Sequence, residues 1–491
     1  MLEPVPMEEQ TYGGNYAITK ELPRQMKVDT DEKLVLWARN RMGPWTGDSL
    51  TIQRLRHLQR MKADDSNRLE RMQHIIPVFG WMHLDMNLCN AIFYHHFSES
   101  SNSGLARDAA ALGRSGLTKP TKSRGPAYHT VDEFMQHTTT ARMRGLWLWA
   151  SGTNTMEQLI AWEKESSPSI IAEAAQKIWL ERASNRATQQ FKSDPQLCNS
   201  IAINRELLLR HEVRYSMRHG DVGRMEHTLP QLLYFFSGAG CANYAREIAE
   251  VLHWRKYEAP PGVADLVRDE CWLINTLGRS DSFYALDLRQ ELNNLYIKYH
   301  FEHGPPPQGC TWEAHRRWGP ALPVFASVIL HMDENFHDFY RSRKHYVPDP
   351  EEDIKLLLKR HAERRIHAET PERPAEAVQE KRHHDCFATG RVKIDEKGYL
   401  DAVAQERIEY FSNLSPLEIA KHDNISMEEA IQLKRREGMK AKGVTPQNTN
   451  NDTYIDEMLE ENAEDLLYGY EQVDEEEYED IRHRLGDGLD S

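Results

Sequence analysis

The pattern of hydrophobic residues changes character near residue 80. Before that point two short apolar runs, Lys33–Ala38 and Ile75–Gly80, are rich in β-branched or aromatic residues and bounded by polar residues or glycine. This pattern predicts two buried strands. Between them Ile52, Leu55 and Leu58 recur at the spacing of a helix face.

After Gly80 the apolar positions follow helical periodicity, interrupted by glycine- and proline-containing turns. The predicted helices are Met82–Phe97, Val131–Ala150, Ile170–Arg186, Ser200–Arg218, Met225–Phe236, Asn243–Trp254, Ala264–Leu277 and about Trp312–Tyr340. We therefore expect a predominantly helical α/β fold, in which a small sheet carries a large all-helical insertion at about residues 98–280. An all-α fold is the alternative.

The composition suggests four regions. Residues 1–30 are expected to form an extended leader, and residues 31–366 the main domain. Residues 367–443 are expected to form a linker and a small helical unit, and residues 444–491 a disordered acidic tail. Within the third region Ser415–Arg436 resembles a helix-turn-helix, but the second helix begins with acidic residues that would repel DNA phosphates. A plain helical hairpin is favoured there.

The net charge of −15 belongs to the C-terminal tail, because Ile455–Ser491 contains fifteen acidic residues and two arginines. The tail is a candidate docking segment for a protein, and the nearly neutral remainder leaves DNA binding open. The chain contains no membrane-spanning run and no secretory signal, and its six cysteines are scattered singly. We expect an intracellular protein, nuclear or cytoplasmic, that is not secreted. The sequence predicts no oligomeric state.

Several segments together carry a family resemblance. GDSLT at 47–51, PVFGWMHLDMN at 77–87 and CWLINTLGRSDSFYALDLRQELNN at 271–294 resemble a fungal family catalogued as domain of unknown function 6589. The likeness extends over roughly residues 30 to 360 in consistent order. The family is associated with mobile elements and has no assigned activity.

The resemblance implies a mechanism to test. Relatives carry an Asp after one strand, an Asp after a second strand and a helical Glu, as ribonuclease H-like transposases do. In those enzymes carboxylates hold two Mg²⁺ ions about 3.5–4 Å apart. Here Asp48 matches the first position and Glu291 the third, whereas Trp81 replaces the second carboxylate. We therefore expect a degenerate catalytic and metal site, with Asp85 or His83 as candidate substitutes and Mg²⁺ as the cofactor if the site functions.

Each of these residues also has a structural interpretation. Asp48 in GDSLT is placed to cap the N-terminus of a helix through its carboxylate. Glu291 lies on a predicted helix with charged neighbours and fits a solvated or ion-paired residue. Trp81 fits a core aromatic residue at a strand end.

Two further groups were considered as binding sites. The loop TKPTKSRGP offers Lys119, Lys122 and Arg124 as candidate contacts to a nucleic-acid backbone, with a solvated loop as the alternative. His95-His96 and His383–Cys386 contain metal-ligand residue types. Neither motif has a partner at ligand spacing in the sequence, which favours surface histidines.

The preferred functional hypothesis is a transposon-derived, ribonuclease H-like protein with impaired catalysis and a residual role in nucleic-acid or protein binding. A helical interaction protein without nuclease ancestry is the first alternative. An active Mg²⁺-dependent nuclease or transposase is the second. The sequence establishes no enzyme activity and no cofactor.

Overall fold

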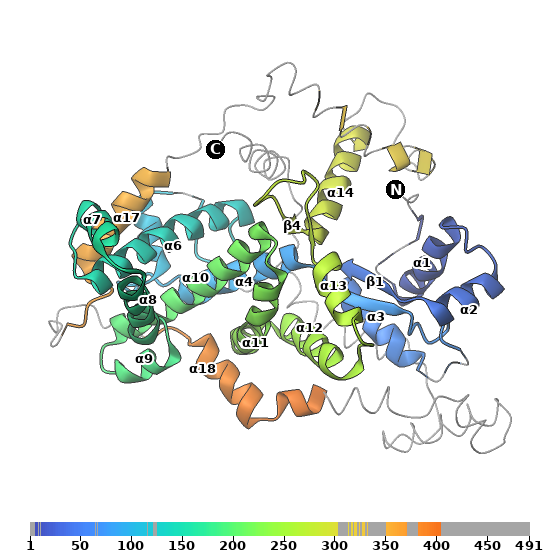
Figure 1. Ribbon diagram of the computed structural model, residues 1–491, viewed down its shortest axis with the longest axis horizontal. Coiled ribbons are helices and arrows are strands. Elements are labelled where there is room, and N and C mark those ends of the chain that lie inside the picture. Colours follow the sequence, from blue (N-terminus) through green and yellow to red (C-terminus); the bar gives the residue numbers. More distant parts are fainter. Residues whose placement is uncertain are drawn as a thin grey trace.

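The computed structural model describes residues 5–7, 9, 11–63, 65, 67–114, 116–120, 125–302, 350–370 and 382–403, with scattered positions between 313 and 331. These residues form a mostly helical fold with two small two-stranded sheets. The strands of the first sheet and helices α1–α3 lie at one end of the elongated molecule (Figure 1). Helices α6–α9 and α17 lie at the other end (Figure 1). The predicted predominantly helical α/β class is confirmed.

The N-terminal segment differs from its prediction. Residues Tyr12–Gln25 form α1, so this part of the expected extended leader is wrong. Asp31–Asn40 form α2, so the predicted strand Lys33–Ala38 is wrong as well. The Thr30 side chain accepts from the amide of Lys33, and Leu34 and Ala38 are buried four residues apart, on one helix face. A six-residue apolar run fits either element, and here the cap selects the helix.

The first sheet pairs β1 (Gly43–Gly47) in parallel with β2 (Ile75–Phe79), in a register that joins Gly47 to Phe79. The predicted strand at Ile75–Gly80 is confirmed, and all five residues of β2 are buried. The strand β1 was not predicted, because three of the five residues in GPWTG are glycine or proline, which are depleted in strands.

Between these strands runs α3 (Ser49–Met61), whose buried residues Ile52, Leu55 and Leu58 confirm the predicted helical spacing. The Gln59 amide donates to the carbonyls of Met72 and Ile75, which ties α3 to the start of β2.

Seven of the helices predicted after β2 are confirmed, with shifted ends: α4 (Trp81–His96), α6 (Tyr128–Ser151), α8 (Pro168–Arg182), α10 (Pro195–His219), α11 (Val222–Ala239), α12 (Ala242–His253) and α13 (Val263–Cys271). The structure adds α5 (Leu105–Leu112), α7 (Met156–Glu165), α9 (Asn185–Gln190) and η1 (Trp254–Glu258), which the sequence pattern did not predict. The predicted helix at about Trp312–Tyr340 lies largely outside the described residues. The largest core cluster is built mainly from α4, α6, α10, α11 and α12. None of the helices in the described part of the chain is long and apolar enough to span a bilayer.

The chain then returns to the strand end of the molecule. A short antiparallel pair, β3 (Leu273–Ile274) and β4 (Tyr284–Ala285), leads directly into α14 (Leu286–Glu302). Helix α14 contacts α4 and both sheets, so it reaches the region where β1 and β2 end. The short helix η2 (Gly319–Ala321) follows among scattered described positions.

Two late segments pack on the helical core. Helix α17 (Pro350–Arg364) packs on α6, and α18 (Cys386–Arg391) with η3 (Val392–Glu396) packs on α11. A Cβ at Gly390 would lie 1.8 Å from the carbonyl oxygen of Tyr234, so α18 meets α11 backbone to backbone. The expected linker and helical unit thus includes a segment that belongs to the core. The candidate hairpin Ser415–Arg436 and the acidic tail lie outside the described residues.

Candidate functional site at the ends of the parallel strands

Asp48 directly follows β1 and begins α3. Its Oδ1 accepts a hydrogen bond from the Thr51 amide at 2.7 Å, which confirms the N-cap interpretation. The cap satisfies one of the amides that the first turn of a helix leaves without a partner. Asp48 therefore has a structural role whether or not it also binds a ligand.

Trp81 follows β2 and is 1% exposed. Its ring packs on Phe79 at a centroid distance of 5.5 Å and on Trp272 at 5.1 Å. The indole Nε1 is buried and has no hydrogen-bond partner among the residues that the structure describes. Trp81 is a core aromatic residue, as the structural interpretation predicted.

Asp287, which was not predicted from the sequence, organises this region. Asp287 lies in the first turn of α14, and its carboxylate accepts from the amides of Met82 and His83, both at 3.1 Å. It also pairs with Nδ1 of His83 at 3.0 Å. Because α4 has no side-chain cap of its own, Asp287 supplies one from a distant helix.

The close approach of Asp287 explains the glycine at position 80. A Cβ at Gly80 would lie 2.1 Å from Oδ2 of Asp287, so a larger residue would displace the carboxylate. Two signals for this contact were present in the sequence: Gly80 opens a helix without a capping side chain, and Asp287 stands one turn before Glu291.

The electrostatics of His83 show which other groups are near. Burial lowers the pKa of His83, but the hydrogen bond and charge of Asp287, followed by the charges of Asp48 and Glu291, outweigh burial and raise it. Asp48, His83, Asp287 and Glu291 are called the strand-end cluster below. Three separate parts of the chain thus meet at the carboxyl ends of the parallel strands, the usual ligand position in open α/β sheets.

Asp85 lies on another face of α4, two residues from His83. Its carboxylate accepts from Nε and Nη2 of Arg210 at 2.9 and 3.0 Å and from Arg214 at 3.2 Å. Tyr128 donates to it at 3.0 Å. These contacts neutralise a buried carboxylate and favour a structural role for Asp85 over the substitution that we considered.

The candidate DNA-binding loop is described only in part. Lys119 is exposed, whereas Lys122 and Arg124 lie outside the described residues. Nucleic-acid contact by this loop stays a prediction.

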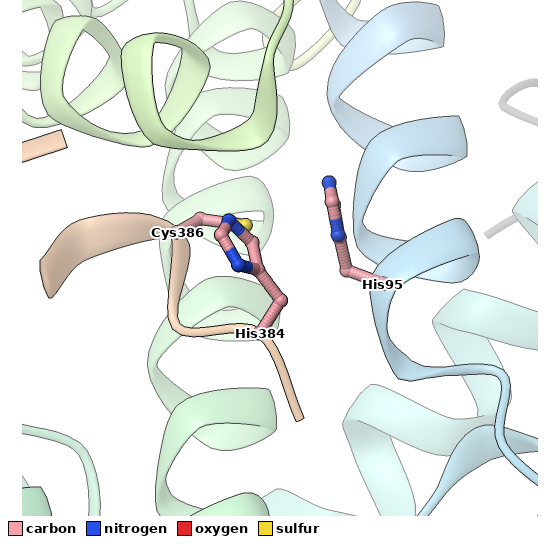
Figure 2. A group of neighbouring side chains, drawn as sticks. All are labelled: His95, His384 and Cys386. Atoms are coloured by element: carbon pink, nitrogen blue, oxygen red, sulfur yellow. The ribbon is translucent and has the colours of Figure 1, made fainter. Parts of the chain in front are cut away.

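Possible metal-ligand groups in the described residues lie away from the strand-end cluster. One comprises Glu133, His137 and Asp353, and the other His95, His384 and Cys386 (Figure 2). The strand-end carboxylates would therefore have to move to hold an ion together. The expectation of surface histidines is wrong for His96, which is fully buried. The motifs His95-His96 and His383-His384 lie against each other in the fold.

The fold and site define a mostly helical protein built around a small parallel strand pair, with an acidic cluster at the strand ends. The chain belongs to a family described as a family of unknown function (DUF6589), which matches residues 1–345. Searches of curated proteins and of solved structures gave no significant match.

Proposed function

We propose that this chain derives from a ribonuclease H-like, metal-dependent transposase, that it no longer cleaves DNA by the two-metal mechanism, and that its residual role is DNA binding. One observation carries the proposal. Asp48 after β1 and Glu291 on α14 both act on His83, just after β2, while Trp81 replaces the intervening carboxylate. This is the arrangement expected of a two-metal site that has lost its middle ligand. The mobile-element origin rests on the family resemblance.

The local chemistry supports impaired catalysis. Two-metal hydrolysis needs carboxylates that converge on ions about 3.5–4 Å apart. Here one oxygen of Asp48 caps α3, and Asp287 is engaged by α4 and His83. Trp81 offers no oxygen, and Mg²⁺ prefers oxygen ligands.

A cleavage assay tests the catalytic half of the proposal. The full chain is incubated with supercoiled DNA in Mg²⁺ or Mn²⁺, beside Asp48→Ala and Asp265→Ala as the exposed-carboxylate control. We expect no nicking by any of the three. Nicking that Asp48→Ala abolishes and Asp265→Ala retains would overturn the claim of impairment.

A binding assay tests the other half. Fluorescence anisotropy with a labelled duplex, repeated over a range of salt concentrations, should show binding that weakens as salt rises, because phosphate contacts release counterions. Lys119→Ala should weaken binding uniformly across sequences and reduce the salt slope by about one unit. The absence of binding at low salt would overturn the proposed role.

A helical interaction protein without nuclease ancestry is the second candidate. The observation that favours it is the size of the parallel sheet, which has only two strands in the described part of the chain. This candidate predicts no DNA binding in the anisotropy assay. The third candidate, an active nuclease that uses Asp85, is disfavoured by the two guanidinium groups that hold that carboxylate.

A further inference from the structure

Two histidine motifs far apart in the sequence meet in the fold. His95 lies in the last turn of α4, Cys386 is the first residue of α18, and His384 lies two residues before it. The rings of His95 and His384 are 4.9 Å apart between centroids, with 32° between their planes. One ligand atom from each of the three residues lies within 4.8 Å of the other two (Figure 2).

Hydrogen bonds to backbone carbonyls orient both imidazoles. Nε2 of His95 lies 3.1 Å from the carbonyl oxygen of Ala239, and Nε2 of His384 lies 2.8 Å from that of Gly238. A carbonyl oxygen can only accept, so each Nε2 carries the proton and each Nδ1 keeps its lone pair. Metal-binding histidines commonly donate their second ring N–H in this way, which fixes the tautomer and the ring orientation.

His95 is half-buried in the last turn of α4. Cys386 is fully buried beside it. A bound cation would stabilise the thiolate form of Cys386, which is the form that coordinates a metal ion.

The other candidate metal-ligand group, Glu133, His137 and Asp353, already has an arginine beside it. Glu133 and Asp353 are both paired with Arg114, and Asp353 is also paired with His137. The guanidinium already supplies the positive charge that a metal ion would bring. Within the described residues, no arginine or lysine forms an ion pair or hydrogen bond with His95, His384 or Cys386.

We propose that His95, His384 and Cys386 bind a Zn²⁺ ion that fastens the α18 segment to α4 and α11. Two imidazoles and one thiolate form a donor set that Zn²⁺ favours. Tetrahedral zinc places such atoms about 3.3–3.7 Å apart, so small side-chain rotations would close the group. The fourth position is open to water or to Cys241, which begins α12 just beyond the two carbonyls. The proposal is independent of the function proposed above.

Cobalt spectroscopy tests the site directly. The full chain is stripped of metal with a chelator and titrated with Co²⁺, then with Zn²⁺ in competition. We expect one equivalent of Co²⁺ to produce a near-ultraviolet thiolate-to-cobalt charge-transfer band, which Zn²⁺ abolishes. The band should be absent in Cys386→Ser and present in Cys271→Ser, the control cysteine on α13.

His384→Ala keeps the test decisive if Cys386→Ser fails to fold, because His384 is exposed and its loss leaves the core intact. His384→Ala should weaken Zn²⁺ binding at least tenfold. In the wild type, Zn²⁺ should slow amide exchange across residues 386–396, and this protection should be absent in His384→Ala. The absence of a band in the folded wild type, or Zn²⁺ affinity unchanged in His384→Ala, would overturn the proposal.

Discussion

Asp287 joins α14 to the N-terminus of α4, and its replacement should open that junction. The side chain is buried and accepts two backbone amides in addition to its contact with His83. Asp287→Ala removes all three contacts. Asp287→Asn keeps one oxygen acceptor but removes the charge.

The magnitude follows from the number and kind of the bonds. A hydrogen bond to a charged group contributes about 1.5–3 kcal/mol net, so the loss of two buried amide bonds should cost about 3–6 kcal/mol in Asp287→Ala. Asp287→Asn should cost roughly half as much, because one amide keeps a neutral acceptor. Gly80→Ala should be strongly coupled to these changes, since its Cβ meets the carboxylate first.

Amide hydrogen exchange with mass spectrometry reads this effect locally, which matters because a chain of this length need not unfold in two states. Peptides that cover Met82 and His83 should exchange about a hundredfold faster in Asp287→Ala if the local cost is near 3 kcal/mol. Asp265→Asn, an exposed carboxylate on α13, serves as the control. Unchanged exchange at Met82 and His83 in Asp287→Ala would refute the capping role.

Three further predictions concern His83, Arg210 and Gly390. The raised pKa of His83 gives stability that is fully present below pH 6.5 and is lost as pH rises through the folded-state value; Asp287→Asn should lower that pKa, as measured by exchange of the imidazole C2 hydrogen. Arg210→Ala should destabilise the local packing by about 3–5 kcal/mol and lower the temperature of the thermal transition, because it leaves Asp85 and Asp132 buried with one cation fewer; Arg144→Ala, at a partly exposed pair, should cost less than about 1 kcal/mol and shift that temperature much less. Gly390→Ala should detach α18 from α11 and speed amide exchange across residues 386–396; equal exchange in the wild type and the variant would contradict the backbone contact.

The helices and strands that could be predicted from the sequence are those with a clear local periodicity of apolar residues. The helices α4, α6, α8 and α10–α13 follow apolar residues at helical spacing, and β2 is a continuous buried apolar run, so these elements were predicted, whereas the shorter helices α5, α7 and α9 were not. The run Lys33–Ala38 carries too few residues to separate a strand from a helix by periodicity. The strand β1 escaped detection because its glycines and proline are held in the sheet by pairing with β2, a tertiary effect.

The residues of the candidate site also fall into those that local sequence indicates and those that only distant contacts bring together. Asp48 and Trp81 could be placed because each stands beside a strand or helix boundary that the sequence reveals. Asp287 and the meeting of His95 with His384 depend on contacts between segments about two hundred or more residues apart, which no local pattern encodes. Asp85 is a candidate ligand from the sequence because it lies one helical turn past Trp81, and its arginine partners on α10 become evident only in the fold.

The measurement that bears most directly on the proposed function combines binding and cleavage on one DNA sample. The full chain is mixed with labelled supercoiled DNA in Mn²⁺, and bound and nicked fractions are quantified together. The proposal predicts salt-sensitive binding without nicking, for the wild type and for Asp48→Ala alike. Nicking by the wild type that Asp48→Ala eliminates, or the absence of any binding at low salt, would contradict it.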